Sequence, residues 1–304
     1  MFLATKIPQK REKIPTGHNM VYSGIFKGIH LQLPLSSTLS RSPGKSGKEE
    51  IMRPEIYTLL KSKFKHKPIE QKNEISILID KKHLVSNNKK FMQMYDWMSR
   101  GYDFAENLIG KLRYRNSIQQ LRSDLISKLE WKNHCKVLYV SIGTGTNLNF
   151  LPKSINTDSL EIVGLDISLG MLQKCQKKFS KKINLSLIHC AAEELPFENN
   201  AFDIVFHVGG INFFSNKKDA ISEMIRVSKP NSKIMIADET SDYINTQYKK
   251  SRLSKKYFEN EQFYLSEIKN NVPEFVTEKK IEYLWEKKFY CLTFRKPALQ
   301  SIFQ

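Results

Sequence analysis

The residues with the clearest chemical potential are two glycines and one acid that follow neighbouring apolar runs. Gly143 and Gly145 come after the run 137–140, and Asp166 ends a second run that starts at residue 162. A short apolar run that stops at a Gly-x-Gly turn is typical of a buried parallel strand, and we expect a helix after the turn. Glycine allows a ligand close to the backbone, and the amides of a following helix would point at it. Since an acid at the next strand tip can accept hydrogen bonds from both ribose hydroxyls, the stretch predicts a nucleoside-cofactor site.

The spacing of the glycines discriminates between cofactors. A dinucleotide site needs a third glycine three residues after the second, and Leu148 stands there instead. Sites for S-adenosylmethionine (SAM) usually read acid-x-Gly-x-Gly-x-Gly. Here Ser141 replaces the acid and Asn147 replaces the last glycine, so the turn alone favours SAM only in part.

Composition indicates a globular protein without metal or disulfide chemistry. The chain has 304 residues, of which 40% are hydrophobic, enough for one large α/β domain with additional material. The four cysteines are far apart and form no C-x-x-C pair, which argues against a zinc site and fits a reducing compartment. No apolar run approaches the roughly 20 residues of a membrane span. We therefore predict a cytoplasmic protein with no transmembrane segment and no metal.

Positive charge is concentrated in the first third of the chain. The formal net charge is +18, and residues 1–100 hold 19 basic and 8 acidic side chains. A basic flank can bind nucleic acid or anionic lipid, and a solvated Lys-rich extension is the plainer alternative. Residues 1–50 lack a sustained period and predict a disordered basic arm, with an organelle-targeting peptide as an alternative. We expect a basic linker or helical segment over 51–87 and a folded domain over 88–304.

The periodicity of residues 88–304 predicts an α/β sheet domain. Apolar residues at helical spacing predict helices near 91–98, 102–109 and 117–129. Strand-like runs near 136–142, 161–166, 185–190, 202–208 and 233–237 alternate with helices at 168–176 and 217–227. This alternation predicts a doubly wound, mostly parallel sheet. Helical stretches follow near 246–258 and 261–269, and the runs 280–284 and 289–294 should pair antiparallel.

Five sequence blocks in order carry a resemblance to a known family. The blocks are 137–147, 164–172, 192–197, 201–205 and 224–230, with Gly143-Thr144-Gly145 and Gly164-Leu165-Asp166 as their centres. Together they resemble class I SAM-dependent methyltransferases, in particular the subgroup of ubiquinone- and menaquinone-pathway methyltransferases. The resemblance spans about residues 88–297. It implies SAM as the cofactor and a Rossmann-like sheet of seven strands, with an antiparallel last strand and N-terminal helices.

The resemblance also implies roles for individual residues. It places Asp166 on the ribose hydroxyls. It puts the other predicted cofactor contacts along the methionine, adenine and methyl parts of SAM: Ser141, Gly143, Thr144, Gly145, Asn147, Ile167, Met171, Ala192, Glu193 and His207. The pair Tyr102-Asp103 resembles a pair that caps the pocket in the quinone subgroup. The predicted substrate contacts are Tyr95, Tyr102, Gly210 and Asn212, and Tyr95 and Tyr102 can equally be core aromatics.

Three positions depart from the family pattern. Ser141 replaces an acid that would anchor the methionine ammonium, and Ala191 replaces a frequent acid next to the adenine amine. Residues 209–212 read Gly-Gly-Ile-Asn where the quinone subgroup often has Gly-x-Arg-Asn. The missing arginine disfavours a quinone-precursor substrate.

The chemistry implied is methyl transfer without a metal, because the sulfonium of SAM is already activated and positioning can supply much of the acceleration. His207 can act as a general base, or it can simply pack at a strand end. We predict a methyltransferase for a small-molecule or lipid-like acceptor at carbon or oxygen. Two alternatives remain open: an RNA methyltransferase that uses the basic arm, and a degenerate SAM-binding interaction module.

Overall fold

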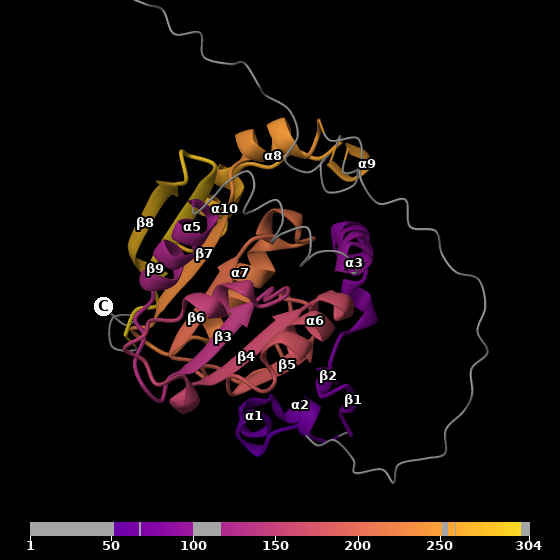
Figure 1. The fold of residues 1–304 in the computed structure, drawn as a ribbon, viewed down its shortest axis with the longest axis vertical. Coiled ribbons are helices and arrows are strands. Elements are labelled where there is room, and N and C mark those ends of the chain that lie inside the picture. Colours follow the sequence, from indigo (N-terminus) through magenta and orange to yellow (C-terminus); the bar gives the residue numbers. More distant parts are fainter. Residues whose placement is uncertain (1–51, 67, 100–116, 251–254, 259, 299–304) are drawn as a thin grey trace, which may run out of the picture.

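The computed structural model describes residues 52–66, 68–99, 117–250, 255–258 and 260–298, which build one sheet with helices on both faces (Figure 1). The strand order is β1-β2-β5-β4-β3-β6-β7-β9-β8. All pairs from β2 to β7 are parallel, and β1, β9 and β8 are antiparallel to their neighbours. The strands are β1 (Glu70–Lys72), β2 (Ile75–Ile77), β3 (Lys136–Val140), β4 (Glu161–Asp166), β5 (Leu185–His189), β6 (Ile204–Val208), β7 (Lys233–Glu239), β8 (Thr277–Leu284) and β9 (Phe289–Arg295).

The helices form two layers because side chains of each strand alternate between the faces of the sheet. Val137 and Tyr139 of β3 pack in the layer of α5 and α6, whereas Leu138 and Val140 pack in the layer of α7 and α10. The helices are α1 (Pro54–Leu59), α2 (Ser62–Lys65), α3 (Ser86–Ser99), α5 (Ser117–Ser127), α6 (Leu169–Phe179), α7 (Lys217–Val227), α8 (Ser241–Gln247), α9 (Lys255–Phe258) and α10 (Leu265–Asn271). The short 3₁₀ helices are η1 (Lys81–His83), η2 (Thr146–Phe150), η3 (Thr157–Ser159) and η4 (Ile211–Phe213).

The predicted mostly parallel Rossmann-like sheet is confirmed, including its antiparallel end. Residues Trp285, Glu286 and Lys287, all with positive φ, form the turn that lets β9 fold back on β8. The predicted helix after the glycine turn is shorter than expected, since only the 3₁₀ helix η2 forms. Pro152 follows directly and disfavours α-helical backbone at Leu151.

The segment expected over 51–87 as a basic linker or helical segment contributes two strands to the same sheet. Asn73 and Glu74, both at positive φ, form a two-residue turn between β1 and β2. Strand β2 pairs in parallel with β5, with Ile75 opposite Leu187, and Leu60 of this segment is fully buried. The sheet therefore has two strands more than the seven predicted, and the boundary expected near residue 88 falls inside the sheet-bearing unit. The predicted arm over 1–50 lies outside the described residues.

Within the described ranges, no helix is long and apolar enough to cross a bilayer. Within the same ranges, no three His, Cys, Asp or Glu side chains are grouped so that they could hold a metal ion. All four cysteines are buried free thiols.

Candidate cofactor and acceptor site

The predicted acid and glycine turn meet at the carboxyl ends of β3 and β4, next to β6. At this point the strand order reverses around β3, the place where open α/β sheets bind ligands. Asp166 Oδ2 accepts a hydrogen bond from Gly143 N over 2.8 Å, and Oδ1 accepts one from Ser168 N over 2.8 Å. Burial raises the pKa of Asp166 to about 6, so the carboxylate is mostly ionised at neutral pH. It can still accept further hydrogen bonds on its remaining lone pairs.

The two glycines of the turn serve different purposes. Both have a left-handed backbone, with φ of 56° at Gly143 and 73° at Gly145. A Cβ at Gly145 would lie 2.7 Å from Cys175 Sγ and 2.9 Å from a ring carbon of Phe179, so α6 packs directly on this glycine. A Cβ at Gly143 would meet no atom within 4 Å. Gly143 therefore faces open space beside the Asp166 carboxylate, which is the arrangement a nucleoside cofactor requires.

The remaining polar residues of the turn are held by the protein itself. Asn147 Oδ1 accepts a hydrogen bond from Arg122 of α5 over 2.6 Å, and Asn147 Nδ2 bonds the Tyr139 hydroxyl. The Thr144 and Thr146 hydroxyls are 3.0 Å apart and share a hydrogen bond. Asn147 and Thr144 are both buried, whereas Ser141 is half-buried with φ of 55°. Arg122 was not predicted, since nothing in its local sequence connects it with the glycine turn.

The predicted adenine contacts lie in the loop after β4, in the first turn of α6 and in the loop after β5. Ile167 is half-buried beside Asp166, and its carbonyl lies 2.9 Å from His189 Nε2. Met171 and Ala192 are buried. The Glu193 carboxylate accepts a hydrogen bond from Asn88 Nδ2 of α3 over 2.8 Å, so this side chain fastens α3.

His207 holds a loop and is not available as a base. Its side chain is fully buried, its Nδ1 lies 3.2 Å from the Val140 carbonyl, and its Nε2 accepts the Ile211 amide over 2.9 Å. Burial lowers the pKa of His207 to about 3, so the ring is neutral at neutral pH. Both ring nitrogens are engaged, as expected for the alternative in which His207 packs at a strand end.

The other residues predicted after β6 divide into open and enclosed positions. Gly209 and Gly210 have φ of 83° and 109°, and a Cβ at either would meet nothing within 4 Å. Asn212 is buried, with Nδ2 donating to the Glu239 carbonyl over 3.0 Å and its amide donating to Asp238. The two glycines therefore border open space at the end of β6, whereas the Asn212 side chain is committed to the protein.

Two acids at the end of β7 were missed, because the predicted strand ended at residue 237. Asp238 accepts the amides of Asn212 and Glu239, and burial raises its pKa to about 6. Glu239 Oε1 accepts the Tyr248 hydroxyl over 2.5 Å. Burial and the Asp238 charge raise the pKa of Glu239 to about 8. Their position at a strand end, like that of Asp166, was the signal that could have found them.

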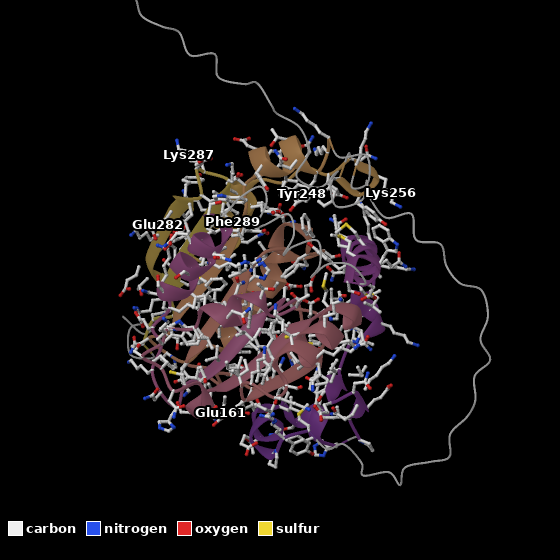
Figure 2. The ribbon with its side chains drawn as sticks, in the orientation of Figure 1. Glu161, Tyr248, Lys256, Glu282, Lys287 and Phe289 are labelled. Atoms are coloured by element: carbon white, nitrogen blue, oxygen red, sulfur yellow. The ribbon has the colours of Figure 1, made fainter. Side chains whose placement is uncertain are left out.

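Aromatic side chains from α3, η4, α9 and the C-terminal end of α8 form a cap next to these strand ends. Phe91 of α3 stacks on Phe213 of η4 with ring centroids 4.5 Å apart, and Tyr248 stacks on Phe258 at 4.8 Å. Figure 2 shows Tyr248 below α8, on the side facing the sheet. We call this group the aromatic cap; its buried members are Phe91, Met94, Phe213, Ile244, Tyr248, Phe258 and Phe263. Tyr95 packs against the cap, whereas Tyr102 and Asp103 lie outside the described residues.

Comparisons with known proteins agree with this geometry. A family model for the methyltransferase domain matches residues 138–236, from β3 into β7. A demethylmenaquinone methyltransferase of Staphylococcus aureus (strain MRSA252) is 30% identical over 156 residues, which cover 51% of this chain and 62% of the relative. The chain thus matches about three-fifths of the length of such curated relatives.

Solved structures share the fold at low sequence identity. Phosphoethanolamine N-methyltransferase 2 of Haemonchus contortus is 17% identical, with a TM-score of 0.55 over 70% of this chain and 61% of that chain. A chain of the complex between the Haloferax volcanii Trm112 methyltransferase activator and a methyltransferase is 13% identical. Its TM-score is 0.52 over 67% of this chain and 98% of that chain.

Proposed function

We propose that this chain is a class I SAM-dependent methyltransferase that transfers the methyl group of SAM to a small-molecule or lipid-like acceptor at carbon or oxygen. The observation that carries the proposal is the Asp166 carboxylate bonded to Gly143 N at 2.8 Å, beside the open side of Gly143. An acid on the ribose and a glycine under the ligand are what a nucleoside cofactor needs. Both lie at the point where the strand order reverses.

The residues around Asp166 fit the parts of SAM. Asp166 would bind the ribose hydroxyls, Gly143 would lie under the methionine part, and Ile167 with Met171 would enclose the adenine. When bound, SAM supplies a methyl group on a sulfonium, which reacts without a metal. The protein's own task is then to place the acceptor in line with that methyl group and to keep water out.

The aromatic cap supports an apolar acceptor. It lies beside η4 and α8, next to the ends of β6 and β7, so an acceptor that enters there meets aromatic rings. The Staphylococcus aureus relative is named for demethylmenaquinone, which belongs to this lipid-like class. Because Ile211 stands where the quinone subgroup often has arginine, we propose the broader class, and the quinol form of demethylmenaquinone is the first acceptor to test.

Glu239 is the best-placed proton acceptor for this reaction. As the acceptor atom bonds to the methyl carbon, the carbon–sulfur bond breaks, S-adenosylhomocysteine leaves, and the acceptor's proton must pass to a base. His207 has no free nitrogen for it. Glu239 is half-buried, and among the described residues its carboxylate receives a hydrogen bond at Oε1, from Tyr248. Its raised pKa, about 8, suits proton transfer near neutral pH.

Calorimetric titration of SAM and S-adenosylhomocysteine into the full chain tests the proposal, with Asp166→Ala beside it. We expect micromolar binding that is lost in the variant, followed by transfer of labelled methyl groups to the quinol. Absence of binding to the wild-type chain would overturn the proposal. Binding without transfer to any acceptor would favour the interaction module. Transfer to RNA that requires residues 1–51 would favour the RNA methyltransferase.

A further inference from the structure

We propose that Asp96 of α3 is a positioning residue for the cofactor site, and that α3 mechanically joins this site to the aromatic cap. The inference rests on the proposed use of SAM. The methyltransferase family model begins at residue 138, so α3 lies entirely outside the matched segment.

Asp96 is linked to Asp166 through one intermediate residue. Asp96 Oδ1 accepts the Ser168 hydroxyl over 2.5 Å and the Gly170 amide over 3.0 Å. The Ser168 amide in turn donates to Asp166 Oδ1 over 2.8 Å. Ser168 is fully buried and caps the N-terminus of α6 through a bond to the Met171 amide. Asp96 therefore fixes the loop on which the ribose and adenine would rest.

The close approach of α3 to α6 depends on a glycine. A Cβ at Gly170 would lie 2.6 Å from Ser99 Oγ and 3.2 Å from Asp96 Oδ1. A side chain at position 170 would therefore displace the Ser99 hydroxyl and crowd the Asp96 carboxylate. The contact between the helices therefore combines the Asp96 carboxylate on α3 with Gly170 in the first turn of α6.

A second set of bonds holds the beginning of α3. Asn88 Nδ2 donates to Glu193 Oε1 over 2.8 Å, and Asn88 Oδ1 accepts the Ser215 amide over 2.8 Å. These partners lie in the loop after β5 and just beyond η4. Helix α3 is therefore fastened near both ends to the loops that surround the proposed cofactor.

A neighbouring face of the same helix carries part of the aromatic cap. Phe91 stacks on Phe213 of η4, and Met94 is buried in the cap beside it. Because one helix holds both sets of contacts, a ligand that orders the Asp166–Ser168 loop also orders the cap residues on α3. The consequence is that cofactor binding prepares the acceptor side of the site.

The test is calorimetric titration of S-adenosylhomocysteine into the full chain as wild type, Asp96→Ala, Asp96→Asn and the control Asp124→Ala. Asp124 lies on α5, where it is half-buried and its carboxylate accepts a bond from the neighbouring Gln120 side chain over 2.7 Å. We expect about tenfold weaker binding for Asp96→Ala, since two hydrogen bonds to a carboxylate are lost. Asp124→Ala should bind as the wild type does. Asp96→Asn keeps an acceptor oxygen and should stay within about threefold at pH 8.

A pH profile separates positioning from mere stability. The titratable groups near Asp166 are Asp96 of α3, Tyr139 of β3, His189 of β5 and Cys190 just after β5. The Asp96 charge raises the pKa of Asp166, and ribose binding needs the ionised carboxylate. Wild-type affinity should thus fall as the pH drops through about 6, and in Asp96→Asn the fall should move to lower pH.

The outcomes are distinct. Binding within twofold of the wild type in Asp96→Ala, with only a lowered Tm, would overturn the inference while leaving the proposed function intact. If Asp96→Ala does not fold, the pH profile of Asp96→Asn decides, and an unshifted profile would overturn the inference. Failure of the wild type to bind S-adenosylhomocysteine would overturn the proposed function and this inference with it.

Discussion

Gly143 and Gly145 share a turn and a left-handed backbone, but their surroundings predict opposite defects on substitution. In Gly145→Ala, the new methyl group would overlap Cys175 and Phe179 of α6. With the cost of a left-handed alanine added, we expect the free energy of unfolding to fall by about 2–4 kcal/mol. In Gly143→Ala, the methyl group meets no protein atom, so the loss should be about 1–2 kcal/mol.

For the affinity for S-adenosylhomocysteine, we expect the opposite order, with the larger loss in Gly143→Ala. Gly143→Ala places a methyl group in the space assigned to the methionine part of SAM, so S-adenosylhomocysteine affinity should fall by more than tenfold. Denaturant unfolding and calorimetry on both proteins provide the comparison. Equal stability losses, or wild-type affinity in Gly143→Ala, would contradict the assignment of the open side of Gly143.

Glu239 and Tyr248 predict a pH-dependent rate. Glu239→Gln should lower kcat by about 10²-fold or more, since a glutamine cannot take up the acceptor's proton, and should leave S-adenosylhomocysteine binding unchanged. The wild-type rate should rise as the pH passes through about 8, where Glu239 ionises. The Tyr248 hydroxyl lowers the pKa of Glu239, so Tyr248→Phe should move that rise to higher pH. Rate profiles of the three proteins with a quinol acceptor measure this, and an unaffected Glu239→Gln enzyme would remove Glu239 from the reaction.

Site residues could be predicted from the sequence where their partners lie close to them along the chain. Gly143, Gly145 and Asp166 could be identified because a strand, a turn and a following acid are a local signature. Asp96 could not, since its partner Ser168 is 72 residues away and neither lies in a recognisable pattern. His207 shows the other limit. Its place at a strand end was visible, whereas the engagement of both its nitrogens exists only in the fold.

At the scale of elements, the segment of residues 52–85, from α1 to η1, acts as a side wall of the cofactor loops. Its strand β2 covers the edge of β5. Lys63, Lys82 and His83 all bond the Glu194 carboxylate, and Lys61 N donates to the Pro196 carbonyl over 2.8 Å. The loop after β5, which carries Ala192, is therefore held from outside the matched methyltransferase segment.

Deletion of residues 1–85 should destabilise the domain and weaken cofactor binding. It removes β2 and so exposes the edge of β5 and the apolar surface that this segment covers. Deletion of residues 1–51 keeps every described element and is the matched control. A point variant, Leu60→Ala, should by itself cost about 2–4 kcal/mol, since Leu60 is fully buried in the core. Thermal unfolding with and without S-adenosylhomocysteine distinguishes these proteins. Equal Tm values for the two truncations would contradict the side-wall role.

Sequence alone missed this segment for a physical reason. Strands β1 and β2 have three residues each, too few for an alternating pattern to stand out from a basic background. The Asn73-Glu74 turn was the available signal, because asparagine tolerates the positive φ of a two-residue hairpin. The central strands, by contrast, are apolar runs buried on both faces, and their alternation with helices is visible without tertiary information.

At the scale of the whole molecule, acids of two kinds set the pH dependence of stability: buried acids with raised pKa values and ion-paired acids with lowered pKa values. Burial raises the pKa values of Asp166 and Asp238 to about 6 and of Glu239 to about 8. Arg295 lowers the pKa of Glu130 and Arg226 lowers that of Glu223, each through side-chain hydrogen bonds. Groups with raised values stabilise the fold below their unfolded pKa, and this contribution is lost as the pH rises through the folded pKa. Groups with lowered values contribute above about 4.5 and lose that contribution as the pH falls.

The two sets together predict a maximum of Tm at about pH 4–5, with a decline towards pH 9 as Asp166 and Asp238, and then Glu239, are forced to ionise. The net charge of +18 increases at low pH and adds self-repulsion there, so the position of the maximum alone does not isolate the buried acids. The variant Glu239→Gln isolates the decline of Tm at high pH. It removes the one of these three buried acids with the highest pKa and leaves the surface lysines in place. Its Tm should decline less between pH 6 and pH 9 than that of the wild type, by an amount equivalent to about 1–3 kcal/mol. Parallel declines in the two proteins would mean that the Glu239 carboxylate ionises without cost and is not the proton acceptor that its surroundings indicate.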